Sequence, residues 1–242
     1  MKTEKIVLSI ETSLKQGSLA LFRGNYEIGN WQGNEVVSRS EDLVIGIEQL
    51  CQKNDIKVQQ LDLIVVSLGP GSFTGLRVGI AVGKGLALAT SCQLVGVPIL
   101  NVMAFYYFQK TNLDSKSQLF CVSGAGRGYV YYQIFMLEKG LIKVDTEIKI
   151  APVISFLEEI AINKNTNNAI VISDANMKFD LININGLDGL GFEWVAIEEP
   201  FSKYLGYSAL NSAFNSSVES VESFINVQNV TSNVTPIYVR EV

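Results

Sequence analysis

The feature that most constrains this chain is the glycine-rich segment Ser67–Ala89, in which a tight turn leads directly into an apolar stretch. Within that stretch Gly75, Gly79, Gly83 and Ala87 recur every four residues, so on a helix they form one strip with almost no side chains, here called the glycine ridge. Each interior glycine costs a helix about 1 kcal/mol relative to alanine. A helix that accepts several of them has to recover that cost through close contact along the ridge.

Two kinds of partner would fit the glycine ridge. Small residues at this spacing let a second element approach the helix backbone closely, and that element belongs either to this chain or to another subunit. Taken by themselves, the residues favour packing within the chain.

The composition excludes several classes of function. Among 242 residues there are 19 Lys and Arg against 24 Asp and Glu, with no basic run, so the chain lacks the basic face that a protein needs to hold nucleic acid by itself. It has no histidine, which rules out a Ser-His-Asp triad and imidazole metal ligands. We expect three free cysteines, a cytoplasmic location and no membrane span, because the apolar run Leu76–Leu88 carries Arg77 and Lys84.

Hydrophobic periodicity predicts an α/β chain of two lobes with mixed sheets, at residues 1–108 and 109–242. Helices are expected at Ser40–Lys53, after the turn at Gly69–Gly75, at Pro98–Phe108, Pro152–Ile162 and Ser202–Asn226. Strands are expected at Lys5–Glu11, Gly17–Arg23, Tyr26–Trp31, Leu61–Ser67, Leu94–Val97, Gln118–Ser123, Tyr129–Glu138, Leu141–Ile150, Ala169–Ser173 and Phe192–Ile197.

A candidate phosphate site begins at Glu11, Thr12 and Ser13, where the first strand is expected to turn into the second. An acidic residue followed by two hydroxyls would suit a magnesium ion and a phosphate. The alternative, which we favour, is a polar hairpin tip capped by its own hydroxyl groups.

The same site would include Gly71 and Ser72, which lie in the turn before the glycine-rich helix. Free backbone N–H groups at a helix start attract anions. The spacing does not fit a Walker P-loop. The favoured alternative is a capped turn in which Ser72 or Thr74 is the N-cap.

Together these segments resemble the TsaB family, also called YeaZ, which shares its superfold with actin, hexokinase and the heat-shock ATPases. The similarity is strongest at Gly69–Ala89 and extends to the opening I-x-E-T-S, to Gly96–Leu100 and to Pro236–Arg240. The resemblance implies a two-lobed actin-like ATPase (ribonuclease H-like) fold, with mixed sheets flanked by helices.

Several positions depart from the family pattern. Glu11 stands where aspartate is usual, Arg39 where histidine is common, and Gly124 and Tyr129 replace acidic residues. Each change alters a group that a nucleotide site would use. We therefore expect no cofactor beyond vestigial nucleotide binding.

The resemblance implies a non-catalytic partner of TsaD, a paralogue that transfers threonylcarbamoyl to the tRNA adenosine next to the anticodon. TsaE and TsaC are further implied partners, tRNA is engaged only indirectly, and the chain alone forms a homodimer. The resemblance also implies that the interface is built by about Ser40–Cys51 and Thr74–Ala89, through Leu43, Ile47, Leu50, Gly75, Leu76, Gly79, Ile80, Gly83 and Ala87.

Two other functions stay open. An ATP-dependent small-molecule phosphotransferase of the same superfold would need a magnesium carboxylate in each lobe, and Glu11 is a candidate whereas Gly124 is not. An inactive homodimer related to the glycoproteases (peptidase M22-like) would act without tRNA. The absence of histidine argues against proteolysis itself.

Overall fold

The computed structural model describes residues 4–33, 40–111, 116–138, 141–163, 168–177, 192–214, 228–229 and 234–239. The chain forms two compact units: Met1–Val102 with Glu199–Ile237, and Met103–Glu198 with Tyr238–Val242. This division differs from the expected lobes at residues 1–108 and 109–242, because Glu199–Ile237 belongs to the first unit, where the helix Phe201–Phe214 packs on the sheet.

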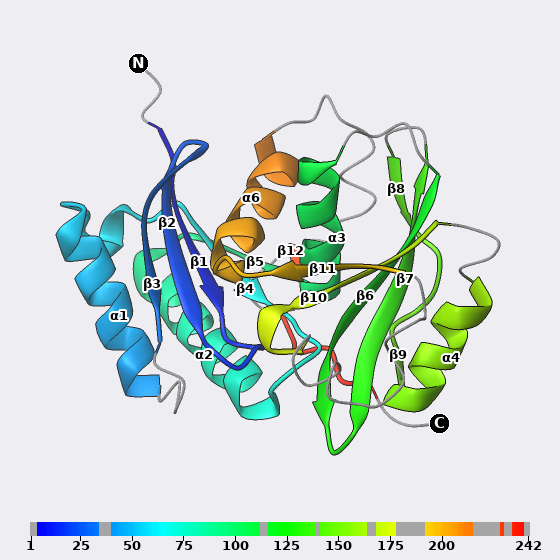
Figure 1. Ribbon diagram of the computed structural model, residues 1–242. Helices are drawn as coiled ribbons and strands as arrows, with labels where there is room; N and C mark the ends of the chain where they lie inside the picture. Colours follow the sequence, from blue (N-terminus) through cyan, green and yellow to red (C-terminus); the bar gives the residue numbers. More distant parts are fainter. Residues whose placement is uncertain are drawn as a thin grey trace. The chain divides into compact units, whose positions relative to one another are not determined.

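The first unit is built on a six-stranded mixed sheet in the order β12-β5-β4-β1-β2-β3 (Figure 1). β1 runs parallel to β4 and β4 parallel to β5, whereas the hairpin pairs β1–β2 and β2–β3 and the pair β5–β12 are antiparallel. The strands are β1 (Ile6–Glu11), β2 (Ser18–Arg23), β3 (Tyr26–Gln32), β4 (Leu63–Ser67), β5 (Gln93–Val97) and β12 (Gln228–Asn229).

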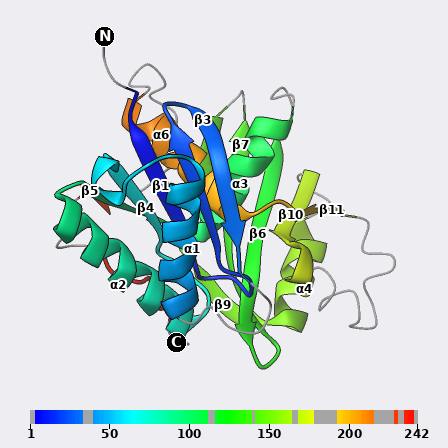
Figure 2. The ribbon, with the colours of Figure 1, turned by 90° about the vertical axis from the view of Figure 1, so that its left-hand side faces the viewer.

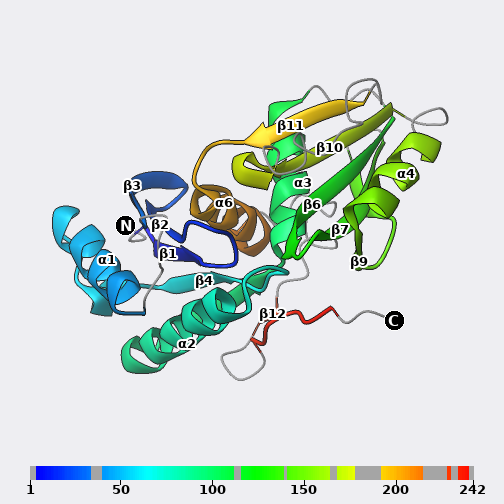
Figure 3. The ribbon, with the colours of Figure 1, turned by 60° about the horizontal axis from the view of Figure 1, so that its bottom comes forward.

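Helices cover both faces of this sheet. α1 (Ser40–Lys53) and α2 (Phe73–Thr90) share one face and α6 (Phe201–Phe214) lies on the other, as Figures 2 and 3 show. Strand alternation explains the division, since Leu8 and Ile10 join the core cluster with α1 and α2, whereas Ser9 donates a hydrogen bond to the Ser202 carbonyl of α6 at 2.6 Å. β1 is buried along its whole length for this reason.

The second unit has a mixed sheet in the order β11-β10-β6-β7-β8, and β9 also pairs with β7. β10 runs parallel to β6 and β11, whereas β7 is antiparallel to β6, β8 and β9. The strands of this unit are β6 (Ser117–Gly126), β7 (Tyr129–Glu138), β8 (Leu141–Val144), β9 (Lys149–Pro152), β10 (Asn168–Asp174) and β11 (Glu193–Ile197), and the helix α4 (Val153–Asn163) belongs to it as well. The helix α3 (Ile99–Lys110) begins in the first unit and continues into the second, and the short helix η1 (Val58–Gln60) belongs to the first unit.

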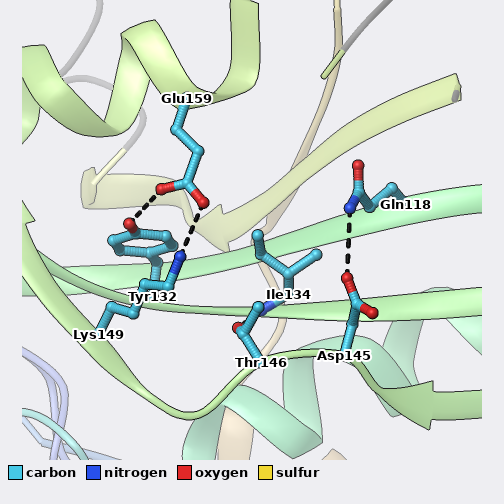
Figure 4. A network of polar contacts seen from close by, with 7 residues as sticks. All are labelled: Gln118, Tyr132, Ile134, Asp145, Thr146, Lys149 and Glu159. Carbon is cyan, nitrogen blue, oxygen red and sulfur yellow. Dashed lines mark hydrogen bonds and ion pairs between the residues drawn. The ribbon is translucent and has the colours of Figure 1, made fainter. Parts of the chain in front are cut away.

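Two expectations for this part of the chain were wrong. The expected strand Leu141–Ile150 is two strands, β8 and β9, because the long strand β7 pairs with both. The turn between them is tied to β7 by Thr146, whose hydroxyl accepts from the Ile134 N–H at 3.1 Å (Figure 4). β6 also continues into the expected loose turn at Gly124–Gly128 and ends at Gly126. The part of the expected helix Ser202–Asn226 that follows Phe214 lies outside the described residues.

A polar cluster fixes α4 and β9 against β7. The buried Tyr132 hydroxyl donates to Glu159, and the ammonium group of Lys149 pairs with the same carboxylate at 2.8 Å (Figure 4). Burial, reinforced by the hydrogen bond to Glu159, raises the pKa of Tyr132 well above its usual range.

Candidate functional site

α2 begins and ends with defined caps. The Ser72 hydroxyl accepts from the Gly75 N–H at 3.2 Å, which confirms Ser72 as the N-cap. Ser91 closes the helix in the left-handed conformation, with φ 59°. The helix therefore spans 18 residues between its N-cap and its C-cap.

The glycine ridge of α2 faces inward. A Cβ atom at Gly75 or Gly79 would come closer to Thr12 than the 3.0 Å that real Cβ atoms keep, and one at Gly83 would meet Val66 at 2.6 Å. Ala87 is also buried. The ridge thus lets α2 lie flush against the β1–β2 turn and the sheet of its own unit. The expectation that the ridge forms a subunit interface is corrected accordingly.

The other expected interface side chains are core residues as well. Leu43, Ile47 and Leu50 of α1, with Leu76 and Ile80 of α2, are at most 5% exposed. The reason is that the apolar period of a helix marks the face that is covered, whether the cover is the same chain or another. All nine expected residues therefore lie on the sheet-facing sides of α1 and α2.

The opposite sides of these helices carry several exposed apolar side chains that sequence reasoning missed. We define the outer face as Val44 and Ile45 of α1 together with Phe73, Arg77, Ala81, Gly85 and Leu88 of α2. Val44, Ile45 and Phe73 are each about half exposed, at 51%, 49% and 52%, and Leu88 is 83% exposed. The Arg77 guanidinium lies 3.7 Å from the Phe73 ring centroid, a cation–π contact.

The middle of the outer face is nearly flat. Ala81 and Gly85 are exposed, and a Cβ atom added to Gly85 would meet nothing within 4 Å. The available signal was a second series of small residues, Ala81, Gly85 and Ala89, which runs beside the glycine ridge in the sequence.

In the β1–β2 turn the donors of the candidate phosphate site are already engaged. Glu11 is fully buried, and its Oε1 atom accepts from the Ser13 N–H at 2.6 Å, from the Leu14 N–H at 3.2 Å and from the Ser13 hydroxyl. Thr12 and Ser13 are buried beside it. The hairpin tip is therefore capped, as the sequence favoured, but the cap is the Glu11 carboxylate and not the hydroxyl groups that were expected.

The turn is also joined to the start of α2. The Ser13 carbonyl accepts from the Ser72 N–H at 2.7 Å, and a side chain on Gly71 would collide with that carbonyl. The Ser67 hydroxyl donates to the Ser13 hydroxyl at 3.1 Å. The five candidate phosphate-site residues, Glu11, Thr12, Ser13, Gly71 and Ser72, are thus brought together as a packed junction.

Within the described ranges, no three or more His, Cys, Asp and Glu side chains gather closely enough to hold a metal ion. Of the helices described, none is long and apolar enough to cross a membrane. Cys51 and Cys121 are buried free thiols, and burial raises the pKa of both, most strongly for Cys121.

The two mixed sheets flanked by helices define the class of fold, which is that of the actin-like ATPases, as expected. YeaZ from Pseudomonas aeruginosa has a similar structure, with a TM-score of 0.69 at 17% identity over 97% of this chain and 100% of that chain. A model of the family described as TsaD, tRNA N6-adenosine threonylcarbamoyltransferase, matches residues 35–233. The chain belongs to this family and, within it, to the TsaB (YeaZ) group.

Two curated relatives are both named tRNA threonylcarbamoyladenosine biosynthesis protein TsaB. The chain is 28% identical to the one from Bacillus subtilis (strain 168), over 63% of this chain and 66% of that protein. It is 26% identical to the one from Buchnera aphidicola subsp. Schizaphis graminum, over 60% of this chain and 69% of that protein. The similarity thus spans about two thirds of the length of these relatives.

Proposed function

We propose that this chain is a non-catalytic subunit that binds and activates a TsaD paralogue during threonylcarbamoyl transfer to the tRNA adenosine next to the anticodon. The names of its relatives supply the process. The observation that carries a binding function is the outer face, where large apolar side chains stay exposed on two adjacent helices.

The outer face has the composition of a protein interface. Exposed apolar side chains grouped on one surface of a folded unit are typical of docking sites, and aromatic and arginine residues are enriched at such sites. Phe73 and Arg77 supply both kinds of residue at the start of α2, and Leu88 lies exposed near its end. The flat stretch at Ala81 and Gly85 between them leaves room for a partner helix to approach closely.

We propose that the same outer face pairs two copies of the chain when the TsaD paralogue is absent. TsaE and TsaC would act on the complex rather than on this face. Binding of tRNA would be indirect, because the chain carries a net charge of −5.

A non-catalytic function is supported by the chemistry of the turn. The backbone donors that would hold a phosphate are used by the chain's own Glu11. An exposed glycine, Gly124, stands where a kinase-like second lobe would need a carboxylate. These features argue against the phosphotransferase alternative.

The test is calorimetric titration of the chain with the TsaD paralogue of the same organism. We expect a stable complex, and we expect Leu88→Glu to weaken it about tenfold or more, because a charge would be buried at the interface. Ile154→Glu is the matched control, since Ile154 is also exposed, at 65%, but lies on α4 of the second unit.

If the wild-type chain binds no TsaD paralogue, or if it turns over ATP in the presence of magnesium, the proposed function is overturned. If Leu88→Glu and wild type bind the TsaD paralogue with equal affinity, the outer face is not the binding surface.

A further inference from the structure

We infer that Glu11 is a built-in anion: its carboxylate takes the place of an external anion in the β1–β2 turn and so positions the start of α2. This inference concerns the inside of the first unit and does not depend on the proposed function.

Three donors converge on one carboxylate oxygen. Oε1 of Glu11 accepts from two consecutive backbone N–H groups, those of Ser13 and Leu14, and from the Ser13 hydroxyl. Successive backbone N–H groups that point at one acceptor form the kind of concave cradle that binds anions. Because Glu11 is fully buried, these three donors take the place of water at its Oε1 atom.

A line of hydroxyl groups points toward the same oxygen. The Gly69 N–H donates to the Ser67 hydroxyl at 3.3 Å, and the Ser67 hydroxyl donates to that of Ser13 at 3.1 Å. The Ser13 hydroxyl in turn donates to Glu11. Every proton in this line is directed toward the carboxylate, and such a line is strengthened when its last acceptor is negatively charged.

The β1–β2 turn, anchored by Glu11, also holds the start of α2. The Ser13 carbonyl accepts from the Ser72 N–H at 2.7 Å, and Ser72 is the N-cap of α2. Gly71 and Gly75 are packed so closely against the turn that neither tolerates a side chain. The turn and the first residues of α2 therefore form one packed junction, and Glu11 is its positioning residue.

The inference is tested by replacing the built-in carboxylate with a free one. Glu11→Ala removes the anion and leaves its three donors without an acceptor, whereas Glu11→Gln fills the same space without the charge. Thermal unfolding of both variants and of the wild type is recorded in sodium chloride and in sodium formate at equal ionic strength.

We expect Glu11→Ala to lower Tm by roughly 10 °C. Formate should recover a large part of this loss, because a ligand that binds only the folded state stabilises it. Wild type and Glu11→Gln should show only the small general salt effect. Hydrogen exchange at the N–H groups of Ser13, Leu14 and Ser72 should be accelerated in Glu11→Ala and slowed again by formate.

If Glu11→Ala does not fold in chloride, its Tm cannot be compared. In that case we measure the fraction of the variant that refolds in formate and the fraction that refolds in chloride, and compare these two fractions. Absence of any formate-specific recovery in Glu11→Ala overturns the inference. A wild-type Tm that rises with inorganic phosphate by as much as the variant's rises with formate would also overturn it, because the turn would then still accept an external anion.

Discussion

Gly79 of α2 leaves no space for a Cβ atom, because the hydroxyl of Thr12 lies directly against its backbone. Since Thr12 is itself buried in the turn after β1, the contact is internal to the first unit. A glycine that resembles part of an exposed interface in the sequence is here the point where the helix meets the turn after β1.

Gly79→Leu should therefore unfold or severely destabilise the first unit. A leucine side chain would have to displace Thr12 and the turn, and overpacking of this kind combined with backbone displacement costs about 3 kcal/mol or more. Chemical denaturation followed by circular dichroism measures the loss. A variant that keeps wild-type stability but fails to bind its partner would restore the ridge as an interface.

Gly85→Ala is the matched change on the other side of α2. Because nothing lies within 4 Å of the added methyl group and the helix interior favours alanine, the free energy of unfolding should rise by about 0.5–1 kcal/mol. The same denaturation experiment measures it. A loss of stability would mean that Gly85 is covered within the first unit.

Ser72→Ala should destabilise the first unit by about 1 kcal/mol, because the Gly75 N–H loses its side-chain acceptor at the start of α2. Ser72→Gly is the control, since glycine at an N-cap costs only a few tenths of a kcal/mol. Denaturant midpoints of the two variants give the comparison. Equal losses for alanine and glycine would show that the cap hydrogen bond contributes little.

The free energy of unfolding should fall at alkaline pH, in part because the Tyr132 hydroxyl titrates. Its pKa is raised in the folded state by burial and by the hydrogen bond to Glu159, so above the unfolded-state pKa of about 10 the unfolded chain loses this proton first. The contribution is fully present below pH 10 and is lost as pH rises further.

Tyr132→Phe removes this titration. At pH 8 we expect it to cost about 1–2 kcal/mol through the lost hydrogen bond, and at pH 10.5 the difference from wild type should shrink. Urea denaturation at both pH values measures the two differences. A difference that grows with pH would contradict the assignment of the raised pKa to the folded state.

The three cysteines should differ in reactivity. Cys51 and Cys121 are buried and burial raises the pKa of their thiols, so at pH 8 they should resist a thiol reagent in the native protein, whereas the half-buried Cys92 should react slowly. All three should react in denaturant. Mass spectrometry of the labelled peptides identifies the sites, and early labelling of Cys121 would show that the second unit opens readily.

Much of the architecture was predictable from local patterns. The apolar run before Ser67 and the period of α1 predicted those elements closely, because burial imposes a two-residue period on strands and a 3.6-residue period on helices. The split of one expected strand into β8 and β9 was not predictable, since it follows from the length of β7, a partner distant in sequence.

The amino-acid sequence by itself determined the family, the mixed α/β organisation, a hydroxyl cap at the start of α2 and the exclusion of histidine chemistry. Tertiary structure decided which side of α2 is covered and what Glu11 does in its turn. Small residues lie on both sides of α2, and the contacts of Gly79 with Thr12 and of Gly83 with Val66 show which side is covered. Local spacing specifies a helix and its period, but burial depends on which distant segments fold against it.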